Sequence, residues 1–395
     1  MTSFQIIFSN SHQVYTPGST VEGTVMIFQE HELKAKCVRI ILEGKAFTKW
    51  EIAEKTPDAH SRGMKVPYSG SVSYLNNQTV VWEHDGVGHR ALTIGQHIFD
   101  FRFELPILPR LPPSFEGTFG AIRYSITALI ERPWKTNKSY TEFFTLAPAF
   151  DLNTVPDARD VVLITRTKNT GFVFFRHGKI IMQCKLAKTG YVSGELIELD
   201  VNIENKTNRP IFKIEAKVIE KTTYVAYRYG AESTRWHGDL YDTETLGYNN
   251  ITVDDRKMFV QEEDVEIAAQ STKTHKFYMQ IPCLVPSFNT CRLIHVSHLI
   301  EIKVTCKGTI NNTARCHCPI IIGTIPLVGC GPIQSISLSD DETPVPLVPT
   351  FEECVSPEVT NRQKSMDFQT NFRPRFPFYG TLISPPEDEE YFNDT

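Results

Sequence analysis

No apolar run in the sequence approaches the roughly 18–20 residues that a membrane-spanning helix needs. The first residues, Met1-Thr2-Ser3-Phe4-Gln5-Ile6, also lack the basic segment and long apolar core of a secretory signal peptide. The nine cysteines are odd in number, scattered and mostly set within apolar stretches, which is typical of reduced thiols. We therefore expect a cytoplasmic protein.

Catalytic signatures are absent as well. The sequence has no G-x-S-x-G nucleophile elbow, no P-loop and no H-E-x-x-H zinc motif. A zinc site built on Cys316 and Cys318 with Cys306 lacks a fourth ligand, and buried thiols are the alternative interpretation. We predict that the protein is not an enzyme and has no catalytic, cofactor-binding or metal-binding residues.

A concentrated basic surface is also missing. The formal net charge is −5, but residues 329–395 hold 12 acidic and 4 basic side chains, a net of −8, which leaves +3 for the remainder. A nearly neutral body with an acidic tail does not suit nucleic acid, whose binding needs clustered lysine and arginine. Nucleic acid is therefore excluded as an expected partner.

What the sequence does contain is strand periodicity. Val38, Ile40 and Leu42 alternate with Arg39 and Glu43, and 99–105 and 198–203 alternate in the same way. Helical periodicity with caps is nearly absent. Alternating strands with one buried and one solvated face predict antiparallel β-sandwiches.

Residues 15–42 recur 176 positions later without a gap, and the register still holds at 101–106. A period of this length indicates a duplicated domain rather than a solenoid. The matching pairs are Tyr15 and Tyr191, Gly18 and Gly194, Val21 and Ile197, Val25 and Val201, Ile27 and Ile203, Val38 and Ile214, Leu42 and Val218, Phe101 and Phe277, Leu105 and Ile281, and Pro106 and Pro282. The sequence thus predicts two tandem immunoglobulin-like β-sandwiches.

We place the first sandwich at residues 1–151, a polar linker at 152–160 and the second sandwich at 161–328. Residues 329–395 hold nine of the 24 prolines and most of the acidic excess. That composition favours a disordered tail.

Several strings give this chain a resemblance to the α-arrestins, the arrestin domain-containing proteins. The resemblance covers roughly residues 4–328. The strings are Val14-Tyr15-Thr16-Pro17-Gly18, Leu111-Pro112-Pro113-Ser114-Phe115-Glu116-Gly117 leading to Ile122-Arg123-Tyr124, Gly190-Tyr191-Val192-Ser193-Gly194-Glu195, and Pro319-Ile320-Ile321-Ile322-Gly323-Thr324-Ile325-Pro326-Leu327.

The resemblance implies an arrestin N-like and an arrestin C-like sandwich in a cytosolic adaptor. Such adaptors bind the cytosolic tails of membrane receptors or transporters and recruit WW-domain HECT ubiquitin ligases through Pro-Pro-x-Tyr motifs. It also implies recruitment to the plasma membrane and endosomes, with cargo ubiquitination, endocytosis and sorting as the result.

The tail lacks an intact Pro-Pro-x-Tyr motif, and its best match is Val348-Pro349-Thr350-Phe351. Pro349 and Phe351 are the candidate WW-binding residues. Val348 loses one fixed backbone torsion and Phe351 loses the hydroxyl of tyrosine, which together weaken WW binding by about ten- to a hundredfold. The alternative is a decayed motif in a structural subunit of an endosomal coat or in a ligase-independent scaffold.

A second tail element, Pro374-Arg375-Phe376-Pro377-Phe378-Tyr379, resembles a family motif of the Pro-Arg-Tyr-Pro type. Its clustered aromatic side chains suit docking. Pro374, Pro377, Phe378 and Tyr379 are therefore candidates for peptide recognition or docking on the chain itself. A sticky unstructured segment is the alternative.

Visual and β-arrestins dock an acidic tail on the first domain until receptor phosphates displace it. By analogy, acidic residues 387–394 would compete with phosphates for Arg39, Lys45 and Lys49, which share one strand parity. The alternative is a solvated cationic face. The Gly/Tyr/Ser-rich segments 61–77 and 228–249 are expected to be loops that contact cargo.

Overall fold

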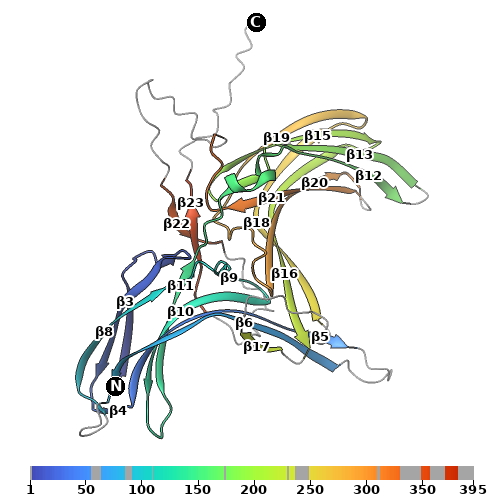
Figure 1. The fold of residues 1–395 in the computed structure, drawn as a ribbon. Coiled ribbons are helices and arrows are strands. Elements are labelled where there is room, and N and C mark those ends of the chain that lie inside the picture. Colours follow the sequence, from blue (N-terminus) through green and yellow to red (C-terminus); the bar gives the residue numbers. More distant parts are fainter. Residues whose placement is uncertain are drawn as a thin grey trace, which may run out of the picture.

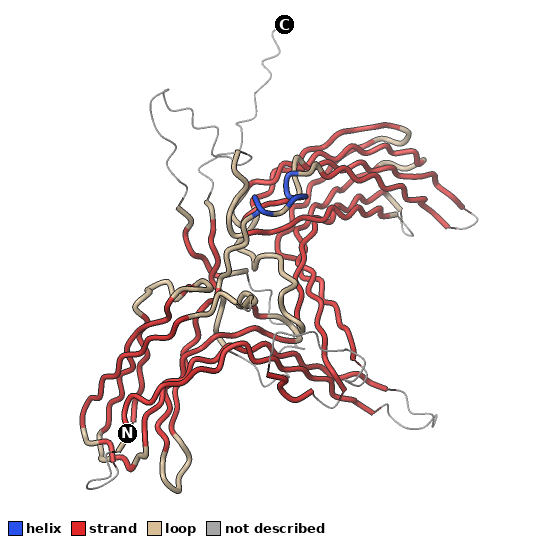
Figure 2. The backbone as a smooth tube through the Cα atoms, viewed as in Figure 1, coloured by secondary structure: helices blue, strands red, loops and turns tan. Residues whose placement is uncertain are grey.

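The computed structural model describes residues 2–54, 64–84, 91–108, 110–172, 175–228, 231–235, 249–308, 312–329, 348–355 and 370–380. Strands dominate these ranges (Figure 2). Helix is confined to two short 3-10 turns in the predicted linker, η1 (Leu152–Thr154) and η2 (Pro156–Arg159). Within the described ranges, no helix has the length and apolar character needed to cross a bilayer. The predicted pair of β-sandwiches is confirmed.

The first sandwich packs a three-stranded sheet, in the order β1-β3-β8, against strands in the order β6-β5-β10-β11-β2. Phe8 lies between the sheets, with its ring centroid 6.2 Å from that of Phe101 and 5.9 Å from that of Phe144. The strands are β1 (Thr2–Phe8), β2 (Val14–Tyr15), β3 (Thr20–Gln29), β4 (Leu33–Lys34), β5 (Cys37–Glu54), β6 (Met64–Glu83), β7 (Ala91–Leu92), β8 (Gly95–Glu104), β9 (Phe115–Glu116), β10 (Gly120–Glu131) and β11 (Lys138–Leu146).

The second sandwich repeats this plan, with a β12-β13-β15-β19 sheet facing strands in the order β14-β21-β20-β16 and β18 paired to β16. The strands are β12 (Val162–Phe172), β13 (Phe175–Leu186), β14 (Gly190–Val192), β15 (Leu196–Thr207), β16 (Ile211–Arg228), β18 (Asn249–Ile267), β19 (Ser271–Gln280), β20 (Ile294–Cys306) and β21 (Thr313–Gly323).

The duplication in the sequence is also a duplication in space. Strands β3 and β8 recur as β15 and β19, and the inward side chains of each pair occupy matching core positions. Gly18 and Gly194 both have positive φ, +85° and +90°, in the turns that precede those strands. Glycine adopts this left-handed conformation at no steric cost, so both copies keep the same turn.

The two sandwiches share one sheet, because the end of β16 pairs with β6. Tyr227 pairs with Ser69 and Arg228 pairs with Tyr68, which joins the larger sheets into a single 12-stranded sheet. Strand β17 (Ala231–Arg235) adds a parallel partner to β6. Figure 1 shows the two lobes extending in opposite directions from this junction.

The tail differs from the expectation of disorder over two segments. Strands β22 (Thr350–Glu353) and β23 (Arg375–Phe378) form an antiparallel hairpin beside the junction (Figure 1). Composition alone predicts disorder, but here non-local contacts with the sandwiches supply the buried surface that the tail by itself lacks. The rest of the tail lies outside the described residues.

Candidate functional site at the domain junction

The hydrophobic core of the first sandwich continues into the second half of the chain. Tyr224, at the inward face of β16, is fully buried among Phe115 and Phe119 of the first sandwich, with ring centroids 6.4 and 5.6 Å from its own. The Thr118 amide donates to the Tyr224 hydroxyl at 3.1 Å, and the Thr48 hydroxyl donates to the Val225 carbonyl at 2.6 Å. These contacts fix one sandwich against the other.

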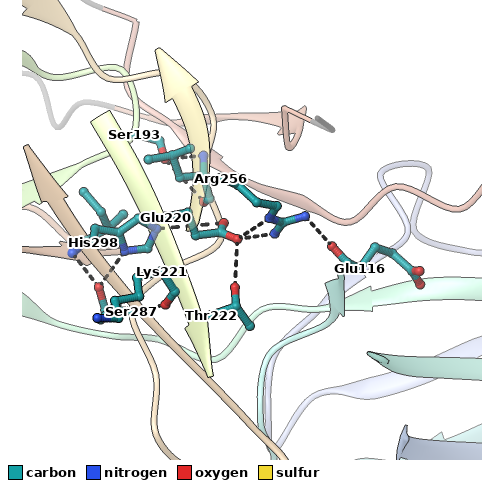
Figure 3. Close-up of polar contacts among 11 residues, drawn as sticks. Glu116, Ser193, Glu220, Lys221, Thr222, Arg256, Ser287 and His298 are labelled. Carbon is teal, nitrogen blue, oxygen red and sulfur yellow. Dashed lines mark hydrogen bonds and ion pairs between the residues drawn. The ribbon is translucent and has the colours of Figure 1, made fainter. Parts of the chain in front are cut away.

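A buried charged cluster lies beside this aromatic contact. Figure 3 shows Glu220 of β16 between Arg256 of β18 and His298 of β20. The Arg256 guanidinium donates to the Glu220 carboxylate from two nitrogens, one of them Nε at 3.0 Å, and also to the Glu116 carbonyl of the first sandwich at 3.1 Å. Arg256 therefore connects a buried carboxylate to the neighbouring domain.

His298 completes the cluster on its other side. Its Nδ1 lies 2.9 Å from the Ser287 hydroxyl, and its Nε2 lies 4.0 Å from a Glu220 oxygen. We assign the neutral tautomer with the proton on Nε2, because that N–H then faces the carboxylate and Nδ1 accepts from Ser287. Burial lowers the pKa of His298 to about 4.

This pKa predicts a pH-dependent stability. The unfolded-state pKa of histidine is about 6.5, so the unfolded chain binds an extra proton between pH 6.5 and 4. The free energy of unfolding therefore keeps its full value above pH 6.5 and falls by about 3 kcal/mol as the pH drops to 4. Urea unfolding at several pH values across this range measures the loss. In His298→Asn the free energy of unfolding should depend less steeply on pH. An equal pH dependence in wild type and variant contradicts the assignment of His298 as a buried neutral histidine.

The tail hairpin docks against both sandwiches at the same junction. Phe376 is 1% exposed and is part of the core that also contains first-sandwich residues. The Arg375 amide donates to the Thr145 hydroxyl of the first sandwich at 3.0 Å, and the Val355 amide donates to the Cys283 carbonyl of the second at 3.0 Å. The hairpin is thus a clasp across the two domains.

Tyr379 ties the end of the hairpin to the second sandwich. Its amide donates to the Ser193 carbonyl at 2.9 Å, and its hydroxyl donates to the Thr324 carbonyl at 2.8 Å. Burial raises the pKa of Tyr379, which keeps that hydroxyl protonated. A Cβ on Gly194 would lie 2.3 Å from the Tyr379 carbonyl oxygen, so only glycine admits the tail backbone here.

The docking candidates of the second tail element all lie in or next to this docked hairpin. Pro374 and Tyr379 are buried, while Pro377 and Phe378 are half-buried within the hairpin. Phe372 extends the contact, with its ring centroid 5.5 Å from that of Phe143 on β11. Residues 370–373, His12 and the β11 edge together line a cleft of about 540 Å³. The geometry favours docking in cis for this element.

The WW-binding candidates lie on the other strand of the hairpin. Phe351 pairs in register with Pro377, is half-buried, and its ring centroid lies 5.5 Å from that of His12. Pro349 precedes β22 and is also half-buried. A WW groove binds such a segment as an extended ligand, so a WW domain that bound Phe351 would have to displace it from the docked hairpin.

Arg39, Lys45 and Lys49 all lie on β5 and point away from the core, as their shared parity predicts. Arg39 forms an ion pair with Glu131 at 3.3 Å, and Lys45 lies opposite Arg123 in the ladder. The acidic residues 387–394 lie outside the described residues. In the described part of the tail, Phe372 contacts Phe143 of β11 next to this face.

The cargo-loop expectation needs correction in one part. Residues 64–77 belong to the 20-residue strand β6, which pairs along its length with β5, because alternating side chains such as Val66, Tyr68 and Val72 face the core. In the other segment, 228, 231–235 and 249 are strand residues, whereas 229–230 and 236–248, like 61–63 of the first segment, lie outside the described residues.

Among the described residues, three cysteine sulfurs come together in the second core. Cys184, Cys316 and Cys318 lie within 4.8 Å of one another and are fully buried. Cys306 is not part of this group, so the zinc set weighed from sequence does not assemble. Three thiolates around one ion would leave net negative charge in an apolar core, a costly arrangement. We therefore interpret the three thiols as core packing.

Comparison with known proteins places these features in a wider group. Residues 4–153 match the family model for the arrestin (or S-antigen) N-terminal domain, and residues 176–327 match that for its C-terminal domain. Arrestin domain-containing protein 4 of Homo sapiens is 29% identical over 332 residues, covering 83% of this chain and 73% of that protein. Arrestin domain-containing protein 17 of Caenorhabditis elegans is 27% identical over 331 residues, covering 82% and 70%. Arrestin domain-containing protein 1 of Mus musculus is 25% identical over 358 residues, covering 89% and 71%.

Proposed function

Because this chain belongs to the arrestin family, as one of the α-arrestins, we propose that it is a cytoplasmic adaptor that links membrane receptors or transporters to ubiquitination, endocytosis and endosomal sorting. Arrestin-family proteins bind other proteins and act as adaptors rather than as enzymes. The adaptor would be recruited to the plasma membrane and endosomes by the cytosolic tails of its cargo.

The tail hairpin is the observation that carries this proposal. It presents a Pro-Thr-Phe motif, at Pro349–Phe351, next to the junction of two fixed sandwiches. Cargo would contact the sandwiches, while the hairpin would open to offer its motif to a WW-domain HECT ligase. Docking of Phe351 makes ligase recruitment conditional on that opening.

WW-domain retention tests the proposal. The wild-type chain should be retained weakly by a panel of WW domains, and Phe351→Ala should abolish retention. Combining Val348→Pro with Phe351→Tyr restores the ring and the hydroxyl, and should raise the affinity by about ten- to a hundredfold. Val348 is 83% exposed and precedes β22, so the proline removes no ladder hydrogen bond.

Pro349→Ala in the restored background is the matched control, because it removes one of the two prolines of the restored motif. Retention that is unaffected by Phe351→Ala, or absent even after restoration, contradicts the ligase link. Such a result favours the second candidate, a structural subunit of an endosomal coat or a ligase-independent scaffold. The missing proline at position 348 and the docked Phe351 are the observations that support that alternative.

A further inference from the structure

The tip of the β10–β11 hairpin exposes a tryptophan completely. Trp134 has a relative exposure of 102%, the highest among the large apolar side chains of the described residues. Its backbone φ of +57° lies in the left-handed region, which a bulky side chain rarely adopts. Unfavourable backbone at an exposed aromatic residue is a feature associated with functional sites.

The loop that carries Trp134 is held in shape. The Arg132 amide donates to the Asn137 side-chain oxygen at 3.0 Å, and the Arg132 guanidinium donates to the Thr136 carbonyl at 3.4 Å. These bonds close the turn from both sides, so the indole is displayed rather than collapsed onto the sheet. Figure 1 shows this hairpin reaching the far end of the first sandwich, away from the junction.

Cationic side chains surround the tip. Arg132, Lys135 and Lys138 flank Trp134 along the chain, and the backbone of Lys36 joins the hairpin by donating to the Glu131 carbonyl at 2.7 Å. The nearest acidic side chain, Glu131, forms an ion pair with Arg39. Glu30 and Glu32 lie in the β3–β4 turn, with Lys34 after them, and Glu83 lies opposite Cys37 at the end of β6, so this end of the sandwich also carries acidic side chains.

We propose that the β10–β11 tip is a membrane-docking site, with Trp134 seated among the headgroups of anionic phospholipids and the exposed Lys135 facing their phosphates. Arg132 and Lys138, which donate to the Thr136 carbonyl and the Thr2 hydroxyl, add positive charge at the same end. Tryptophan prefers the membrane interface because its indole is apolar on its faces and polar at its N–H. Lysine and arginine are attracted to the negative surface of a cytoplasmic leaflet. One aromatic anchor with several cations supplies the two signals that stable peripheral binding requires.

A lipid surface fits this tip better than a protein pocket does. Protein interfaces bury an aromatic anchor within an apolar patch from which charged side chains are depleted. At this tip Pro133 is the one apolar neighbour of Trp134 along the turn, and residues 132 and 135–137 are charged or polar. Ile94, 68% exposed in the turn before β8 at the same end of the sandwich, adds a second apolar contact. The site needs no cargo, so it is independent of the function proposed above.

Vesicle co-sedimentation of the full chain is the test. The chain should bind phosphatidylcholine vesicles that contain about 30 mol % phosphatidylserine, and should not bind vesicles of phosphatidylcholine alone. Trp134→Ala should weaken binding by about tenfold, Trp134→Phe by less, and Lys135→Gln by about fivefold. Added salt should reduce the binding of every form. Because Trp134 is fully exposed, none of these changes should alter the melting temperature.

Leu108→Ala is the matched control, because Leu108 is 75% exposed at the other end of β8. It should bind vesicles as wild type does. Equal binding by wild type and Trp134→Ala, or equal binding to both vesicle types, overturns the proposal. So does a loss of cargo-peptide or WW-domain retention in Trp134→Ala without vesicles present, since that places a protein pocket over the tip. The WW-domain assay contains no lipid, so the two proposals fail separately.

Discussion

Replacing Arg256 with methionine should lower the free energy of unfolding by about 3–5 kcal/mol, because it leaves the Glu220 carboxylate buried without its partner. Methionine fills much of the volume of the arginine side chain, so the loss of stability comes from the missing charge rather than from a cavity. The change also removes the donor to the Glu116 carbonyl, which couples the second sandwich to the first. Urea unfolding at pH 7 measures the effect.

Two controls separate the causes of that loss. Replacing both partners, Glu220→Leu with Arg256→Met, removes the buried charge altogether and should recover most of the stability. Lys276→Ala breaks an ion pair with Glu198 in which both side chains are about half exposed and solvent-screened, and it should change the stability little. An Arg256→Met variant as stable as the Lys276→Ala variant would show that the buried pair does not stabilise the junction.

The sequence contained a signal for this cluster. Along β16, Ile214, Ala216 and Val218 define the inward parity, and the same parity continues to Glu220 and Thr222. A carboxylate at an inward strand position must find a partner. What no pattern in one sequence identifies is that partner, because Arg256 and His298 reach Glu220 only through the pairing of β18 and β20 with β16.

The fold itself was predictable because its causes are local and repeated. The alternation of apolar and polar residues identifies the buried face of each strand. The 176-residue offset shows that the same strands, with the same buried faces, occur twice. The docked tail was not predictable in the same way. Its proline and acidic residues favour disorder, and its order arises from contacts such as that of Tyr379 with Ser193, which are far apart in the sequence. Gly194 belongs to the repeat, but its second role, admitting the tail, is visible only in space.

Replacing Phe376 with alanine should release the tail hairpin. A fully buried phenylalanine contributes about 3–5 kcal/mol relative to alanine, and Phe376 is the one fully buried aromatic residue in the described part of the tail. The hairpin has two short strands, and its hydrogen bonds to Thr145, Cys283 and Ser193 contribute about 1 kcal/mol each, so the Phe376 side chain is its largest single contact. Amide hydrogen exchange in β22 and β23 should accelerate by about a hundred- to several thousandfold, while β5 and β10 should keep their protection.

Phe372→Ala serves as the graded control, because its half-buried ring makes one aromatic contact worth about 1 kcal/mol. It should accelerate exchange only slightly. If the hairpin is a releasable clasp over the WW-binding candidates, Phe376→Ala should also strengthen WW retention, because Phe351 becomes accessible without a change of motif. If instead Phe376→Ala lowers protection in β5 and β10 as much as in β22 and β23, the hairpin is an integral part of the sandwich core, and the idea of conditional ligase access fails with it.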